Sequence, residues 1–134
     1  MFRTELFRSD PFADFDRIFS GSTPTRRAPQ LAVDAVQHED RIELRFDLPG
    51  VPVDDIDLTV DQGVLRLAVE RSFETGEDDT VLSNERWTGT RARSFRLGDR
   101  LDADELESSY DAGVLTVTIP VKATEQPRRI AIAA

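Results

Sequence analysis

The sequence predicts an all-β protein, an immunoglobulin-like antiparallel β-sandwich with a flexible N-terminal arm and a C-terminal tail. Three observations predict this fold. Apolar and charged residues alternate in several short runs, turn-forming residues separate these runs, and no helical period connects one run to the next. Because each alternating strand has one apolar face, a second sheet is needed to cover it.

The clearest strand covers residues 41–48, where apolar and charged residues alternate without an exception. Pro49 and Pro52 bracket a turn that ends this strand. Two further strands are predicted at residues 31–36 and 91–97. Two hairpins are predicted where paired runs flank a turn: residues 56–60 and 64–69 around 61–63, and residues 110 and 114–119 around 111–113.

One internal segment, residues 71–85, departs from the strand pattern. It is too polar for a core strand and long for a hairpin loop, and loops of this length usually have a function. Its only adjacent apolar pair is Val81-Leu82. This pair is a candidate for a short strand that is donated to another part of the assembly.

The N-terminal segment is rich in phenylalanine. Five of the eight phenylalanines lie in the first 19 positions: Phe2, Phe7, Phe12, Phe15 and Phe19. Asp10 before Pro11 predicts a helix start, and the last three of these rings then share one helix face. Two interpretations stay open, a helix packed on its own domain and an exposed adhesive arm.

Charge divides the chain into three regions. We assign residues 1–30 to an arm and linker, residues 31–121 to the sandwich domain and residues 122–134 to a C-terminal extension, with net charges of +1, −12 and +2. The whole chain carries −9, which is the wrong sign for a protein that binds nucleic-acid phosphates. Membrane association is also not expected, because no apolar run is long enough to span a bilayer and the arm lacks a basic face. The absence of cysteine and of a secretory signal favours a cytoplasmic protein.

Catalytic chemistry has little support in the sequence. The only histidine, His38, is predicted to be a solvated residue in a turn, with no cysteine or second histidine to complete a triad or a metal site. The only lysine, Lys122, follows no glycine-rich phosphate loop, and no pair of carboxylates is singled out among 26 acidic residues. We therefore expect no enzyme activity, no catalytic residue, no cofactor and no bound metal.

The C-terminal extension ends with two isoleucines, Ile130 and Ile132, separated by one residue. In an extended chain they point to the same side, and Pro127 keeps the preceding residue from helical geometry. Such a segment can add as a strand to a sheet edge and insert two apolar side chains into a groove. The alternative is an unstructured tail in which the two isoleucines have no partner.

Several motifs occur in the order found in one known family. They are Asp47-Leu48-Pro49-Gly50, Asp54-Asp55-Ile56, Glu85-Arg86 with Gly89 and the run 93–97, the run 113–120 and Ile130-Ala131-Ile132. Together they span most of the chain, and the chain thereby resembles the small heat-shock proteins built on an alpha-crystallin domain, particularly the bacterial and plant branch. Arg91 and Gly98 depart from the residues usual at their positions, an aromatic and a proline, which bears on local edge packing and leaves the fold unaffected.

The resemblance implies an ATP-independent holdase that takes part in the stress response and binds unfolding client proteins. It implies that the chain pairs with itself to form dimers, and that the dimers assemble into a larger homo-oligomer. In this branch the loop that matches residues 71–85 exchanges a short strand with the partner, which gives Val81 and Leu82 a place at the dimer interface. Arg93 matches an interface arginine, for which an acidic domain offers carboxylate partners.

The resemblance also implies that the tail of one dimer docks into a groove of another. By alternation, Leu58 and Val60 from one strand and Ser108 from a neighbouring strand are expected to line that groove. The phenylalanine-rich arm is expected to contact clients. A rival interpretation is a non-catalytic β-sandwich adaptor, resembling a co-chaperone, that binds one folded partner; it leaves the arm and the paired isoleucines without a role.

Overall fold

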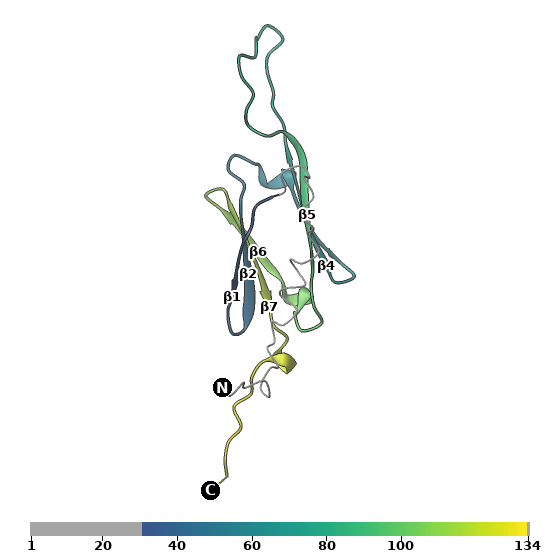
Figure 1. The fold of residues 1–134 in the computed structure, drawn as a ribbon, viewed down its shortest axis with the longest axis vertical. Coiled ribbons are helices and arrows are strands. Elements are labelled where there is room, and N and C mark those ends of the chain that lie inside the picture. Colours follow the sequence, from purple (N-terminus) through teal and green to yellow (C-terminus); the bar gives the residue numbers. More distant parts are fainter. Residues whose placement is uncertain (1–30, 134) are drawn as a thin grey trace, which may run out of the picture.

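The computed structural model describes residues 31–133, which form two antiparallel sheets packed face to face (Figure 1). The four-stranded sheet has the order β1-β2-β7-β6, and the three-stranded sheet has the order β3-β4-β5. The strands are β1 (Asp34–Gln37), β2 (Arg41–Asp47), β3 (Ile56–Asp61), β4 (Val64–Arg71), β5 (Gly89–Arg96), β6 (Glu107–Asp111) and β7 (Val114–Pro120). This architecture confirms the predicted all-β sandwich.

The core lies between the two sheets and is built from the alternate residues of three long strands. These residues are Ile42, Leu44 and Phe46 of β2, Leu65, Leu67 and Val69 of β4, and Leu115, Val117 and Ile119 of β7. Phe46 of one sheet meets Phe95 of the other edge to face, with ring centroids 6.0 Å apart. The period of two read from the sequence therefore identifies the buried face of each of these strands.

Both predicted hairpins are present, and both turn through left-handed backbone. Gln62 and Gly63 have φ of 49° and 74°, and Ala112 and Gly113 have φ of 51° and 77°. Positive φ at both central residues is the requirement of the type I′ turn, whose twist matches that of paired strands. The second turn also packs against the turn after β2, where the Leu48 amide donates to the Gly113 carbonyl at 2.6 Å.

Some strand boundaries differ from the predicted ones. The first strand begins at Asp34 and not at residue 31, while β5 begins two residues earlier than predicted, at Gly89. Arg71 belongs to β4, so the long loop covers residues 72–88. Val81 and Leu82 are not in a strand of this single chain.

Short 3₁₀ turns are the helical elements of the described residues: η2 (Val53–Asp55), η3 (Ala103–Glu105) and η4 (Ala123–Glu125). None of the helices between residues 31 and 133 is long and apolar enough to cross a membrane. The phenylalanine-rich arm and the helix predicted in it lie outside the described residues.

Candidate functional site

Leu58 and Val60 lie on the inner face of β3. Leu58 pairs with Leu67 and Val60 pairs with Leu65, and both partners are fully buried. Directly paired residues share a face of the sheet, so Leu58 and Val60 point toward the opposing sheet. Leu58 is half-buried, and 39% of Val60 is exposed. Both remain partly accessible because β3 is an edge strand that pairs only with β4.

Ser108 lies on the inner face of the other sheet. It pairs with the fully buried Val117, so its side chain points the same way as the core residues of β7. Contrary to the expectation from the sequence, its strand β6 is not a neighbour of β3 in one sheet, because the two strands are the edges of different sheets. Any groove lined by Leu58, Val60 and Ser108 therefore runs between the layers.

Two hydrogen bonds place β3 and β6 at the same edge of the sandwich. The Tyr110 hydroxyl of β6 lies 2.5 Å from the Leu48 carbonyl oxygen and 2.8 Å from that of Val51, just before the chain enters β3. At the opposite edge, Arg93 of β5 donates to the Leu31 carbonyl at 2.8 Å, just before β1. β3 and β6 thus border the same open side of the sandwich, which we call the β3/β6 edge.

The C-terminal segment leaves the sandwich at the end opposite the long loop (Figure 1). It is attached through the bridge between Leu101 and Val121, and the Gln126 amide donates to the Val121 carbonyl at 2.8 Å. Beyond this point Ile130 is 78% exposed and Ile132 is 94% exposed. The two isoleucines therefore do not pack on the domain of their own chain.

The loop of residues 72–88 extends beyond the sandwich at its other end (Figure 1). A local turn near its tip is closed by Asp79, whose carboxylate accepts from the Gly76 amide at 2.6 Å. Val81 is 50% exposed and Leu82 is 95% exposed. The loop thus presents an apolar pair of which Val81 is half exposed and Leu82 almost fully exposed.

Arg93 is held at the inner face of β5, opposite the buried Leu67. Its guanidinium carbon lies 5.2 Å from the centroid of the Phe95 ring, and it donates to the Leu31 carbonyl. Desolvation by burial lowers the pKa of the Arg93 guanidinium, because a buried charge loses hydration. The described contacts tie Arg93 to the entry of β1, beside an edge strand of the four-stranded sheet.

The base of the long loop contains a cluster that the sequence analysis missed. Trp87 is half-buried, and the guanidinium carbons of Arg71 and Arg91 each lie 4.4 Å from its ring centroid. Arg71 also donates to the Pro49 carbonyl at 2.6 Å. The alternation of residues along the strands could have revealed this cluster. Arg71 and Arg91 occupy positions that continue the inner faces of β4 and β5.

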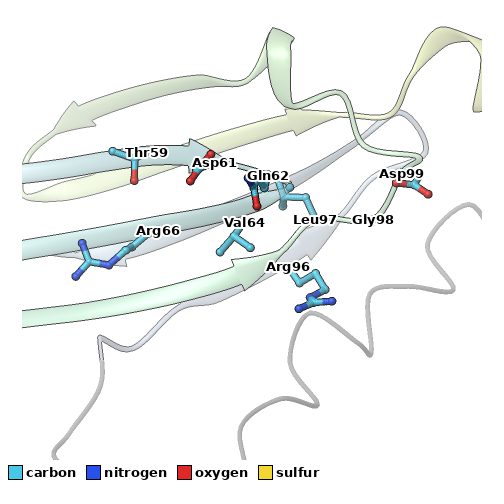
Figure 2. A pocket seen from close by; sticks show the side chains of 10 residues that line it. Thr59, Asp61, Gln62, Val64, Arg66, Arg96, Leu97, Gly98 and Asp99 are labelled. Carbon is cyan, nitrogen blue, oxygen red and sulfur yellow. The ribbon is translucent and has the colours of Figure 1, made fainter.

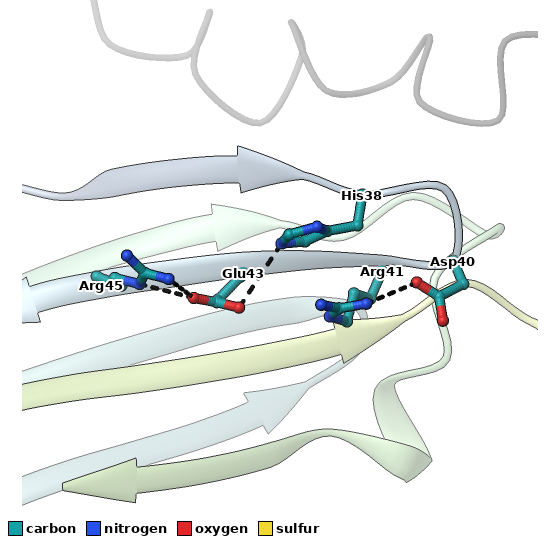
Figure 3. A network of polar contacts seen from close by, with 5 residues as sticks. All are labelled: His38, Asp40, Arg41, Glu43 and Arg45. Carbon is teal, nitrogen blue, oxygen red and sulfur yellow. Dashed lines mark hydrogen bonds and ion pairs between the residues drawn. The ribbon is translucent and has the colours of Figure 1, made fainter. Parts of the chain in front are cut away.

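His38 is less solvated than predicted. It ends up half-buried beside β2, because the turn after β1 folds its ring toward the outward side chains of that strand (Figure 3). Its Nε2 lies 3.7 Å from a carboxylate oxygen of Glu43, whose other oxygen accepts from Arg45 Nε at 2.6 Å. The three side chains form a network at the surface of the four-stranded sheet.

A shallow pocket of about 860 Å³ covers the outer face of β3, β4 and β5. Arg66 and Arg96 line it together with Asp61 and Asp99, and Figure 2 shows the two arginines extending in different directions from neighbouring strands. Its polar groups do not converge on one point, which a cofactor site requires. Within residues 31–133 no three acidic, histidine or cysteine side chains are grouped so that they could hold a metal.

Comparison with known proteins agrees with the fold. The model of the Hsp20/alpha crystallin family matches residues 34–133. The 18 kDa antigen 2 of Mycobacterium avium is 42% identical over 95% of this chain and 91% of its own length, and the 18 kDa heat shock protein of Streptomyces albus G is 34% identical over 95% and 92%. A small heat-shock protein structure from Xylella fastidiosa has a TM-score of 0.65 and 33% identity, covering 82% of this chain and all of the other. The resemblance found in the sequence is thereby confirmed.

Proposed function

Because the chain belongs to the Hsp20/alpha crystallin family, which supports a chaperone role, we propose that it is an ATP-independent holdase. It binds partly unfolded proteins through apolar surface and prevents their aggregation. The observation that carries this proposal is the distribution of exposed apolar side chains. Most of the exposed large apolar side chains of residues 31–133 lie at three places around a closed core: the tail, the long loop and the β3/β6 edge; Val36 and Val53 are the others.

The tail and the β3/β6 edge are matched in spacing. In an extended chain alternate residues lie about 7 Å apart on one side, so Ile130 and Ile132 repeat the spacing of Leu58 and Val60. We propose that the tail of one subunit adds along the β3/β6 edge of another, with Ser108 as the opposite wall. The acidic domain attracts the positively charged extension, which adds to this contact in low salt.

The expected strength of one tail contact is modest. Full burial of an exposed isoleucine contributes about 1.5 to 3 kcal/mol, so the pair contributes on the order of 3 to 6 kcal/mol. Association itself costs at least about 4 kcal/mol in lost freedom. A single contact is therefore near balance, and a stable assembly needs many of them. An assembly of this kind opens in response to a small change in conditions and uncovers the same apolar surface for clients.

Dimer formation is assigned to the long loop. Val81 and Leu82 pair as a short strand with a second copy, next to the entry of β1 where Arg93 is anchored. The phenylalanine-rich arm, with Phe2, Phe7, Phe12, Phe15 and Phe19, contributes further client contacts. Hence the domain, residues 31–121, supplies the scaffold, while residues 1–30 and 122–134 supply adaptable contacts.

The test combines particle size with protection of a client. The full chain is compared with the variant Ile130→Ser/Ile132→Ser and with the matched control Ala131→Ser/Ala133→Ser, which changes the residues that alternate with the isoleucines. Light scattering at rising temperature, without nucleotide, follows the aggregation of an added thermolabile protein. The full chain and the control should form a large particle and suppress aggregation, whereas the isoleucine variant should sediment as dimers.

The opposite result is equally clear. A chain that stays monomeric or dimeric and leaves client aggregation unchanged is not a holdase. That outcome favours the adaptor interpretation.

A further inference from the structure

The base of the long loop carries an unusual concentration of positive charge for this acidic chain. The guanidinium groups of Arg71 and Arg91 both lie over the Trp87 ring, and Nη2 of Arg86 lies 3.6 Å from the position that a Cβ on Gly50 would occupy. We call Arg71, Arg86, Arg91 and Trp87 the arginine platform. It lies where β4 ends and β5 begins.

The platform lacks anionic partners within its own chain. Among the described residues, none of its three guanidinium groups lies within 4.0 Å of a carboxylate, although residues 31–121 carry 21 acidic side chains. Arg71 Nε is buried and Arg71 Nη2 donates to the Pro49 carbonyl, so the accessible donors of the platform belong to the exposed Arg86 and the half-buried Arg91. Stacking uses the face of a guanidinium and leaves its N–H edge available, which is the edge that binds a carboxylate in a bidentate manner. The platform therefore presents oriented donors that await an anion.

Acidic side chains lie on the same loop, and all of them except Glu85, which precedes Arg86, come before residue 80. Residues 72–88 contain Glu74, Glu77, Asp78, Asp79 and Glu85 against the single cation Arg86. All five acidic residues are exposed, and none forms an ion pair with a cation of residues 31–133. At this end of the molecule the base of the loop is positively charged, and residues 74–79, which we call the acidic projection, are negatively charged.

Such an arrangement is self-complementary under a two-fold axis. An isologous interface brings the same patch of two copies together. When that patch has separate positive and negative parts, the positive part of each copy can contact the negative part of the other, which gives two equivalent contacts. Within one copy the loop extends away from its own base (Figure 1). In a pair of copies related by a two-fold axis, the acidic projection of each has the base of the other as its complementary surface.

We infer that the arginine platform is the seat for the acidic part of the long loop, residues 74–79, of a second copy of this chain. This inference rests on the proposed dimer and adds an electrostatic lock to its apolar contact. It makes the dimer selective for chains that carry both halves of the charge pattern. It also makes dimer stability depend on salt, because exposed charge pairs are screened.

The test is a charge exchange between two full-length variants. Both are made in the Ile130→Ser/Ile132→Ser background, so that dimers are measured without higher assembly. The platform variant is Arg86→Glu/Arg91→Glu, and the loop variant is Glu77→Lys/Asp78→Lys, which leaves the local turn at Asp79 intact. Sedimentation at a series of concentrations gives the dimer dissociation constant.

Each variant alone should dissociate at least tenfold more readily than the background protein at low salt, because both contacts in its homodimer become repulsive. Mixed in equal amounts, the two variants should form heterodimers of near-background affinity. In the heterodimer the new lysines face the new glutamates, and the unchanged loop faces the unchanged platform. In 1 M salt, where the screening length falls to about 3 Å, the differences should shrink.

The variant Arg66→Glu/Arg96→Glu is the matched control, since it reverses two arginines of the same strands on the outer face of the sheet. It should dimerise like the background protein. If the background protein dimerises and the platform and loop variants do so equally well, the lock is refuted while the proposed dimer stands. If the background protein is monomeric at every concentration, both proposals fail. If the circular dichroism spectrum shows that the platform variant has not folded, the dimer dissociation constant of the loop variant alone decides the test.

Discussion

Gly113 should be the least replaceable glycine of the sandwich. Its φ is +77°, and a Cβ at this position would lie 3.0 Å from Cα of Pro49, which is backbone that cannot rotate away. Left-handed backbone costs a residue with a side chain about 1 to 2 kcal/mol. Overpacking against a rigid neighbour adds about 1 to 3 kcal/mol, so Gly113→Ala should destabilise the domain by about 2 to 5 kcal/mol.

Gly63 is a matched control for this substitution. It occupies the equivalent position of the other hairpin with a φ of +74°, but its nearest neighbour would lie at 3.6 Å, an ordinary contact distance. Gly63→Ala should therefore incur only the backbone cost of about 1 to 2 kcal/mol. The difference between the two variants measures the contact with Pro49.

Urea unfolding followed by tryptophan fluorescence gives both values. The protein has one tryptophan, and equal subunit concentrations keep the contribution of assembly constant. The midpoint should fall in both variants with an unchanged slope, and it should fall farther for Gly113→Ala. Equal midpoints for the two variants would refute the reasoning from the Pro49 contact.

Two further substitutions test the same region. Tyr110→Phe removes the hydroxyl that donates to the Leu48 and Val51 carbonyls. The free energy of unfolding, measured by thermal unfolding, should fall by about 1 to 3 kcal/mol. An unchanged melting temperature would contradict a role for this hydroxyl in holding the turn before β3. Ala112→Asn places a residue that tolerates left-handed backbone at a φ of 51°, so it should raise the melting temperature slightly, whereas a lower one would show that the strain is not at this residue.

The sequence predicted well those features that depend on neighbours along the chain. Alternation over residues 41–48 identified Ile42, Leu44 and Phe46 as one face, and these side chains are buried in the core. The turns at residues 61–63 and 111–113 were recognised because each begins with aspartate and ends with glycine, which adopts positive φ without cost. The motifs that led to the family were also local runs.

Features that depend on the pairing of distant segments were predicted less well. His38 was expected to be solvated because its immediate neighbours are polar, yet the turn brings it beside Glu43. The arginine platform joins the end of β4, the start of β5 and the turn at Pro49, which lies 22 residues from Arg71. The first strand begins late because pairing with β2 starts at Asp34, opposite Arg45.

The sequence by itself determined the strands, the two hairpins, the acidic character of the domain and the two isoleucines of the tail. Only the tertiary structure decided that β3 and β6 border one open edge from different sheets, and that Arg71 and Arg91 meet at the Trp87 ring. The physical reason is that alternation and turn preference act between residues a few positions apart. Which edges face each other depends on how two complete sheets bury their apolar faces together.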